Sequence, residues 1–374
     1  MKQSNRFKTR VILILFLMAA LLLSACGQTV NTTTASTAAA TSKAAATSGT
    51  TSGTMTTTAT TSAAPTTTTA AVPAFPVRVK DGSGKDVVIK SAPQAIVCTN
   101  LWAAEILFEL VETDRIVGLS MWNDKAAMTV TTEKAKAVEA RVSTQRSEGI
   151  IMLMPDLVII DSFSDPDGSL AKTLTGAGAV VLVMNSPTDF AMIADAIRTI
   201  AKAVGSDTAG ERLVNDMNST LEQVSKAVRG IQEQDRLKTL YYEAYYDQSG
   251  PNAGMLAAYG EGSTFSAIAE VAGLVNVCNA PNYSAISKEK IVGEWQPDIL
   301  VVPAIVFDAQ YEPLPDANKT LVTAVLNDPL MQSLPAVQNK QVFALTEAYR
   351  GSTSQYMAKA VEELAKFAYP SLFP

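Results

Sequence analysis

The sequence predicts an α/β fold of two lobes with mostly parallel sheets, joined by a helix. Short apolar runs alternate with helical segments at the spacing of parallel βαβ units. A motif in the first half, Met-Pro-Asp-Leu-Val-Ile-Ile at 154–160, returns as Gln-Pro-Asp-Ile-Leu-Val-Val at 296–302. Such helix–Pro-Asp–strand units also recur by chance in α/β proteins. Together with the alternation, the repeat favours two lobes of related plan.

The first lobe, residues 75–185, opens with a predicted hairpin over 77–89, whose turn is Asp-Gly-Ser-Gly. Apolar runs then predict buried strands, and the periodic segments between them predict helices. The strands are expected at 95–98, 116–119, 157–160 and 180–184, and the helices at 102–111, 148–153 and 170–176. Asn100 stands where it can cap the first of these helices.

Residues 186–205 form the predicted connecting helix, because apolar side chains recur there at helical spacing. A second helix at 208–228 and a strand at 237–242 begin the second lobe, 206–374. Each Pro-Asp motif follows a short helix that starts near a glutamate. Glu148 lies seven residues before Pro155, and Glu289 lies eight residues before Pro297.

The N-terminus has the layout of a signal peptide over residues 1–25. Basic residues precede an uncharged apolar run at 11–23 that is short for a membrane-spanning helix. Leu-Ser-Ala-Cys at 23–26 resembles the bacterial lipoprotein signal, which implies a palmitate-bearing lipid on Cys26. The chain would then be anchored at the outer face of the bacterial cytoplasmic membrane. An ordinary signal peptide with an incidental Cys is the alternative.

Residues 26–74 are mainly Thr, Ala and Ser with one charge, Lys43, and we expect a disordered linker. Composition also excludes whole classes of function. The net charge of −6 argues against nucleic acid as a partner. The absence of His excludes Ser-His-Asp and Cys-His catalysis and His-based zinc sites. We therefore predict no enzyme, no cofactor and no metal site. Cys98 and Cys278 are expected to be buried thiols, although a disulfide between them stays open.

Several segments match one family in order and spacing. They are the hairpin at 79–87, the units at 95–107 and 114–118, the two Pro-Asp strand entries, and residues 334–343. In this order they resemble the substrate-binding proteins of ABC importers for iron–siderophore, haem and cobalamin, over residues 75–374. The resemblance implies one long helix between the lobes, a ligand cleft between them, and a monomer. It also implies an ABC permease dimer with its ATPase as partner, on which Glu148 and Glu289 dock.

Ligands of α/β sheets bind beyond the carboxyl ends of the strands, which selects the candidate cleft residues. They are Asn100, Trp102, Trp122, Phe163, Tyr245, Tyr246, Ser263, Tyr349 and Arg350. Aromatic side chains with few charges suit a large amphipathic ligand. The expected function is capture of an iron–siderophore-type chelate, with cobalamin (or another corrinoid) or haem as alternatives. A sensory or adhesive surface lipoprotein is the alternative of another class.

Overall fold

The computed structural model describes residues 75–244, 256–308 and 312–373, which belong to the compact unit Thr68–Pro374. The expected signal peptide (1–25), linker (26–74) and lipidated Cys26 lie outside the described residues. So do Tyr245 and Tyr246. No helix in the described part of the chain is long and apolar enough to cross a membrane.

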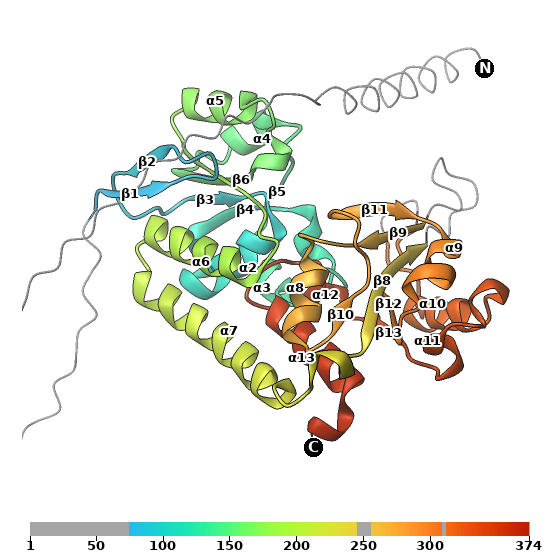
Figure 1. Cartoon of the computed structure of the whole chain (residues 1–374). Coiled ribbons are helices and arrows are strands. Elements are labelled where there is room, and N and C mark those ends of the chain that lie inside the picture. The colour runs from blue at the N-terminus through green and yellow to red at the C-terminus, as the bar shows by residue number, and fades with distance from the viewer. Residues whose placement is uncertain (1–74, 245–255, 309–311, 374) are drawn as a thin grey trace, which may run out of the picture. The chain divides into compact units, whose positions relative to one another are not determined.

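A five-stranded parallel sheet forms the first lobe, in the order β5-β4-β3-β6-β7 (Figure 1). Its strands are β3 (Ile96–Cys98), β4 (Ile116–Ser120), β5 (Arg141–Val142), β6 (Leu157–Asp161) and β7 (Val180–Met184). The predicted hairpin is confirmed as the antiparallel pair β1 (Val77–Lys80) and β2 (Asp86–Ile89). Four of the five parallel strands therefore occupy runs that the apolar pattern predicts.

Both faces of this sheet are covered, which explains why its strands read as unbroken apolar runs. In β6, Leu157 and Ile159 belong to one core cluster, whereas Val158 and Ile160 belong to another on the opposite face. This is the period of two that a strand imposes on its side chains. The hairpin, α2 and α6 supply residues to the first cluster, and α4 and α5 supply residues to the second.

The second lobe contains a mixed sheet in the order β11-β9-β8-β12-β13, with β10 also paired to β8. Its strands are β8 (Lys238–Ala244), β9 (Leu256–Tyr259), β10 (Val275–Asn276), β11 (Tyr283–Ile286), β12 (Ile299–Pro303) and β13 (Val342–Leu345). Strands β8, β10, β12 and β13 run parallel, whereas β9 and β11 are joined by antiparallel pairing. The fold is thus the predicted α/β type, with one antiparallel edge.

The helices of the described residues pack around and between the two sheets (Figure 1). Their bounds are α2 (Leu101–Leu110), α3 (Thr132–Ala135), α4 (Ser147–Ile151), α5 (Ser169–Gly176), α6 (Phe190–Val204), α7 (Asp207–Val228), α8 (Thr264–Val271), α9 (Lys288–Lys290), α10 (Ala317–Leu326), α11 (Pro335–Gln338), α12 (Glu347–Arg350) and α13 (Met357–Ala368). One hydrophobic cluster runs from α2 and α6 through α7 to α8 and α13, so both lobes share a continuous core.

The long connecting helix is α7 rather than the segment 186–205 expected from the sequence. Helix α6 occupies that segment and begins only at Phe190, because Asp189 caps it by accepting a hydrogen bond from Met192 N at 2.7 Å. Its main contacts are with β1, α2 and α7. Helix α7 contacts α6 and α2 of the first lobe and α13 and α8 of the second. A helix packed on both lobes favours small closure movements.

The repeated Pro-Asp motif has the same geometry in both lobes. Met154 and Gln296, just before each proline, have φ of 48° and 43°, in the left-handed region. The Asp156 carboxylate accepts hydrogen bonds from Gln94 N and Ala95 N at 2.7 and 3.1 Å, beside the start of β3. The Asp298 carboxylate accepts one from Lys238 N at 2.8 Å, at the start of β8. Each aspartate thus fastens its strand to the neighbouring one.

A π-helical turn explains why the two glutamates differ in spacing. In the second lobe Ile291–Trp295 is a π-helix, and Gln296 N donates to Ile291 O at 2.9 Å. A π-turn takes up one residue more than an α-turn. The additional residue between Glu289 and Pro297 is therefore absorbed in this turn, and Glu289 occupies the position that matches Glu148.

Candidate functional site

The carboxyl ends of the strands in both lobes carry side chains that meet between the lobes. Trp122, in the turn after β4, makes an edge-to-face contact with Phe307, which follows β12, with ring centroids 6.2 Å apart. Lys125 of the same first-lobe turn forms an ion pair with Glu312 of the second lobe. Of these residues the sequence predicted only Trp122. The strand-end rule applied to β12 would have selected Phe307 as well.

Phe163 and Trp102 have different environments although both were expected in the cleft. Phe163 follows β6 and is 90% exposed. Trp102 is buried in the first-lobe core, and its Nε1–H donates to the Asp161 carboxylate at 3.4 Å. The same carboxylate also accepts from Phe163 N, at 2.8 Å, and from the Ser186 hydroxyl. Trp102 and Asp161 thus hold the strand end that presents Phe163.

Asn100 lies at the N-cap position of α2, but its side chain does not cap the helix. The residue is 6% exposed, and its Oδ1 accepts a hydrogen bond from the Thr99 hydroxyl at 3.1 Å. Its Nδ2 has no partner among the described residues. A buried amide donor without a partner costs free energy.

Arg350 follows β13 and is enclosed by second-lobe residues. Its Nε and Nη2 both donate hydrogen bonds to the Glu347 carboxylate, the Nε bond at 2.9 Å. The guanidinium carbon lies 4.9 Å and 4.8 Å from the ring centroids of Tyr241 and Tyr259. Burial alone would lower the pKa of Arg350, but Glu347 and the two tyrosines raise it well above its usual value. The charge is therefore permanent and already balanced.

Aromatic rings continue from Arg350 toward the end of β8. Tyr259 lies 4.8 Å from Tyr283, centroid to centroid, and the Tyr283 hydroxyl donates to Glu243 at 2.8 Å. Burial raises the pKa of Glu243. Tyr349 is half-buried, with the Lys359 ammonium 5.5 Å from its ring centroid. The second lobe thus offers mainly aromatic side chains here, and the charge of Arg350 is neutralised by Glu347.

Ser263 lies away from this edge because β9 runs antiparallel to β8. Tyr242 of β8 pairs with Ala258, so the end of β9 points toward the start of β8. The Ser263 hydroxyl accepts from Ser266 N at 3.3 Å, which caps α8, and donates to Gly260 O at 2.6 Å. This position favours a structural role.

A buried acid joins the lobes beside the candidate site. Glu105 of α2 is fully buried, and its carboxylate accepts hydrogen bonds from the hydroxyls of Thr129, Ser352 and Ser354. Gln355 Nε2 donates to the backbone oxygen of Glu105 at 3.3 Å. Burial raises the pKa of Glu105, although the three hydroxyls oppose the shift. No motif in the sequence indicates this group, because Glu105 stands within a mainly apolar helical segment.

Replacement of Glu105 by Gln is expected to change how stability depends on pH. Because the folded-state pKa is raised, the carboxyl contributes stability below its unfolded pKa, near 4.3, and loses it as pH rises through the folded pKa. Gln does not titrate. The free energy of unfolding of Glu105→Gln relative to the natural chain should therefore rise from pH 4 to pH 8. Urea unfolding at both pH values measures this, and a pH-independent difference would contradict it.

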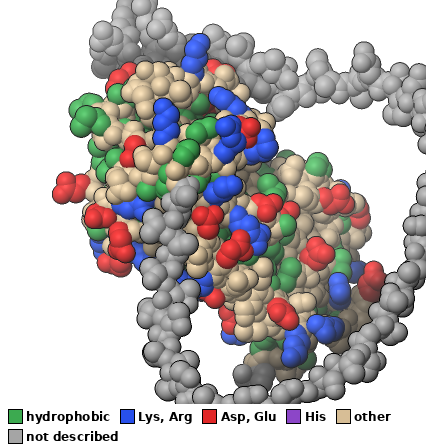
Figure 2. All heavy atoms as spheres, turned by 90° about the vertical axis from the view of Figure 1, so that its left-hand side faces the viewer, with side chains coloured by type: hydrophobic (Ala, Val, Ile, Leu, Met, Phe, Trp, Pro, Cys, Tyr) green, Lys and Arg blue, Asp and Glu red, His purple; other side chains and the backbone are tan. Residues whose placement is uncertain are grey.

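Glu148 and Glu289 lie on the outer helices α4 and α9, and both are exposed. The Glu289 backbone N–H and the Ser287 hydroxyl lower the pKa of Glu289, so its carboxylate is ionised at neutral pH. On the face shown in Figure 2, basic and acidic side chains are interspersed.

Cys98 and Cys278 are buried free thiols, as predicted. Burial raises the pKa of Cys98 to about 12. Within residues 75–244, 256–308 and 312–373, no group of three or more acidic or Cys side chains is positioned to hold a metal ion.

Two α/β lobes share a helical core, and aromatic side chains from both lobes meet between them, which is compatible with a two-lobe solute-binding protein. The family described as periplasmic binding protein matches residues 96–349. The chain belongs to this family, which comprises extracytoplasmic solute-binding transport proteins.

Two curated relatives and one solved structure illustrate the similarity. The uncharacterized ABC transporter substrate-binding lipoprotein YvrC of Bacillus subtilis is 26% identical over 307 residues, 80% of this chain and 87% of that protein. A cobalamin-binding protein of Halobacterium salinarum is 24% identical over 232 residues, 61% of this chain and 58% of that protein. The crystal structure of the haem-binding protein HmuT is 23% identical, with a TM-score of 0.61, and covers 81% of this chain and 93% of that one.

Proposed function

We propose that this chain captures a metal-chelate ligand between its lobes and delivers it to an ABC permease and its ATPase. The contact between Trp122 and Phe307 carries this proposal, because it brings aromatic surface from both lobes to the edge where α/β sheets bind ligands. The Asn100 Nδ2, which has no partner among the described residues, and the exposed ring of Phe163 support the same location. Binding and delivery need no chemical step, and we propose no enzymatic activity.

The ligand class follows from the walls of the site. An iron–siderophore is the ligand we predict from the sequence. A corrinoid is the second candidate, favoured by the cobalamin-binding relatives and by the neutralised charge of Arg350. A wall of aromatic rings, with the buried Arg350 paired to Glu347, binds a large ligand mainly by apolar contact. Haem is a weaker candidate, because without His its iron would need a Tyr or Met ligand.

Docking on the permease is proposed for Glu148 and Glu289. The two exposed carboxylates occupy matching positions in the repeated units, one on each lobe. Matched anionic positions suit the two basic sites of a permease dimer, where such charges set orientation and encounter rate. The receptor is proposed to act as a monomer, because the two lobes of one chain supply both positions.

Lipidation of Cys26 is proposed to tether the receptor to the outer face of the cytoplasmic membrane. The linker at 26–74 would give the folded part reach above that surface. A surface lipoprotein with a sensory or adhesive role would share this anchor, but it would need no permease.

A titration of the full chain tests the proposed ligand class. Tryptophan fluorescence is followed against cyanocobalamin, ferric ferrichrome and haem. We expect saturable quenching by one class, lost in Trp122→Phe and retained in Trp295→Phe, whose ring is buried in the second-lobe core. Absence of saturable binding by all three would overturn the proposal.

A further inference from the structure

The end of α4 presents an exposed apolar surface next to Glu148. Met152 and Met154 are 80% and 84% exposed, whereas methionine is usually buried in folded proteins. Met152 N donates to Glu148 O at 2.9 Å, so these two residues lie one helical turn apart on the same side of α4. We call Met152, Met154 and the cavity beside them the methionine patch.

Met154 has a backbone conformation that is unfavourable for residues with a side chain. Its φ of 48° is left-handed, where Gly or Asn is the favoured residue. Unfavourable conformations of this kind concentrate at functional sites. The matching position in the second lobe has the polar residue Gln296, with φ of 43°. An apolar side chain is therefore not required by the turn.

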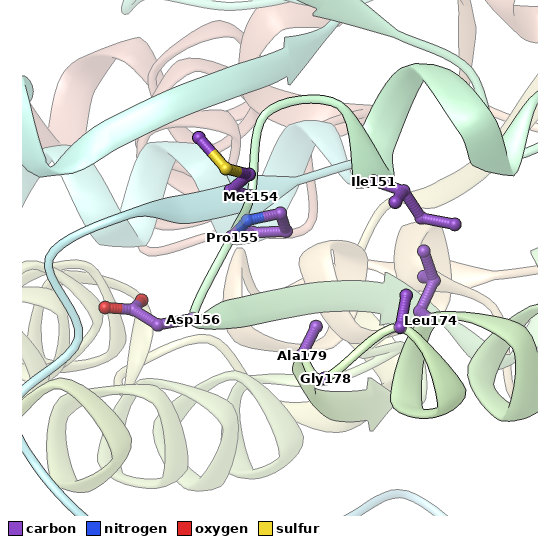
Figure 3. Close-up of a pocket in the computed structure, with 8 residues that line it drawn as sticks. Ile151, Met154, Pro155, Asp156, Leu174, Gly178 and Ala179 are labelled. Atoms are coloured by element: carbon purple, nitrogen blue, oxygen red, sulfur yellow. The ribbon is translucent and has the colours of Figure 1, made fainter.

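An apolar cavity of about 370 Å³ adjoins Met154, between α4 and α5 (Figure 3). Met154 and Pro155 lie on one side of it, and Ile151 and Leu174 lie on the other. The one charged lining residue, Asp156, points away and binds the backbone at the start of β3. The cavity is lined mainly by apolar residues, and its volume of about 370 Å³ is large enough to admit an apolar side chain.

We propose that the methionine patch receives an apolar side chain from an extracytoplasmic loop of the permease, next to a basic residue that pairs with Glu148. This inference rests on the proposed function and adds a second contact to docking. Met152 is the C-cap residue of α4, one turn from Glu148, and Met154 lies in the turn that follows, so a loop that reaches the carboxylate comes close to both methionines. Flexible thioether side chains adapt well to a partner surface.

Affinity for the permease tests the proposal. The lipidated full chain is titrated onto the permease–ATPase complex of its importer in nanodiscs. We expect Met152→Gln/Met154→Gln to weaken binding at least tenfold, and the melting temperature to stay unchanged because both side chains are exposed. Met192→Gln, a partly exposed methionine on α6, is the matched control and should bind normally.

Glu148→Gln separates the patch from the docking proposal. Weaker binding by Glu148→Gln with normal binding by the double methionine variant would overturn the patch alone. Normal binding by both variants would overturn the patch and the docking role of Glu148. If the methionine substitutions instead abolish self-association in sedimentation, or binding to phosphatidylglycerol vesicles, with permease affinity unchanged, the patch serves a second copy or lipid and the inference fails.

Discussion

Replacement of Arg350 by Met is expected to lower the free energy of unfolding by about 3–5 kcal/mol, because it leaves a buried carboxylate without its partner. The side chains of Arg350 and Glu347 are 8% and 9% exposed, so water screens their pair very little. The guanidinium also packs against the rings of Tyr241 and Tyr259. Urea unfolding monitored by circular dichroism measures the loss.

A double variant distinguishes loss of the ion pair from loss of volume. Arg350→Met/Glu347→Leu removes both charges, and apolar replacement of a whole buried pair is often close to neutral. We expect it to recover at least half of the stability lost in Arg350→Met. If the single variant unfolds like the natural chain, Arg350 is not a structural anchor and the sequence-based role as a ligand contact gains support.

Replacement of Trp122 by Ala should weaken ligand binding at least tenfold, which corresponds to about 1.4 kcal/mol. The ring is half-buried and contacts Phe307, so its loss removes aromatic surface at the point where the lobes meet. Large aromatic anchors at the centre of a binding site carry much of its energy. Calorimetric titration with the ligand identified by fluorescence measures the change.

Phe307→Ala is the companion to this variant, because it removes the other half of the same contact. We expect a similar loss of affinity, and the double variant should lose less than the sum, since both substitutions disrupt one contact. Unchanged affinity in both single variants would place the ligand elsewhere.

The fold was largely predictable because its strands are buried on both faces. The runs at 157–160 and 180–184 have too many apolar residues for a half-exposed strand, and they occupy the sheet as predicted. The connecting helix was assigned one element too early. Segment 190–204 has the stronger apolar stripe, yet that stripe packs within the first lobe, whereas α7 reaches both lobes.

The candidate site was only partly predictable, because sequence order does not reveal strand direction or contacts between lobes. Ser263 was selected as though β9 were parallel, and antiparallel pairing moves it away. The Lys125–Glu312 pair joins residues far apart in sequence, neither of which has a distinctive neighbourhood. Asn100 was expected to cap α2, but its side chain is buried without capping the helix, and its amide nitrogen has no partner among the described residues.

Cross-linking the two lobes tests most directly whether the ligand binds between them. Lys125→Cys and Glu312→Cys place thiols on either side of the interlobe ion pair, and Cys98 and Cys278 are buried away from reagent. A chain joined there by a short bismaleimide before ligand is added should fail to bind it. A chain joined after binding should fail to release it. Equal affinity and release in the joined and unjoined chains would contradict capture between the lobes.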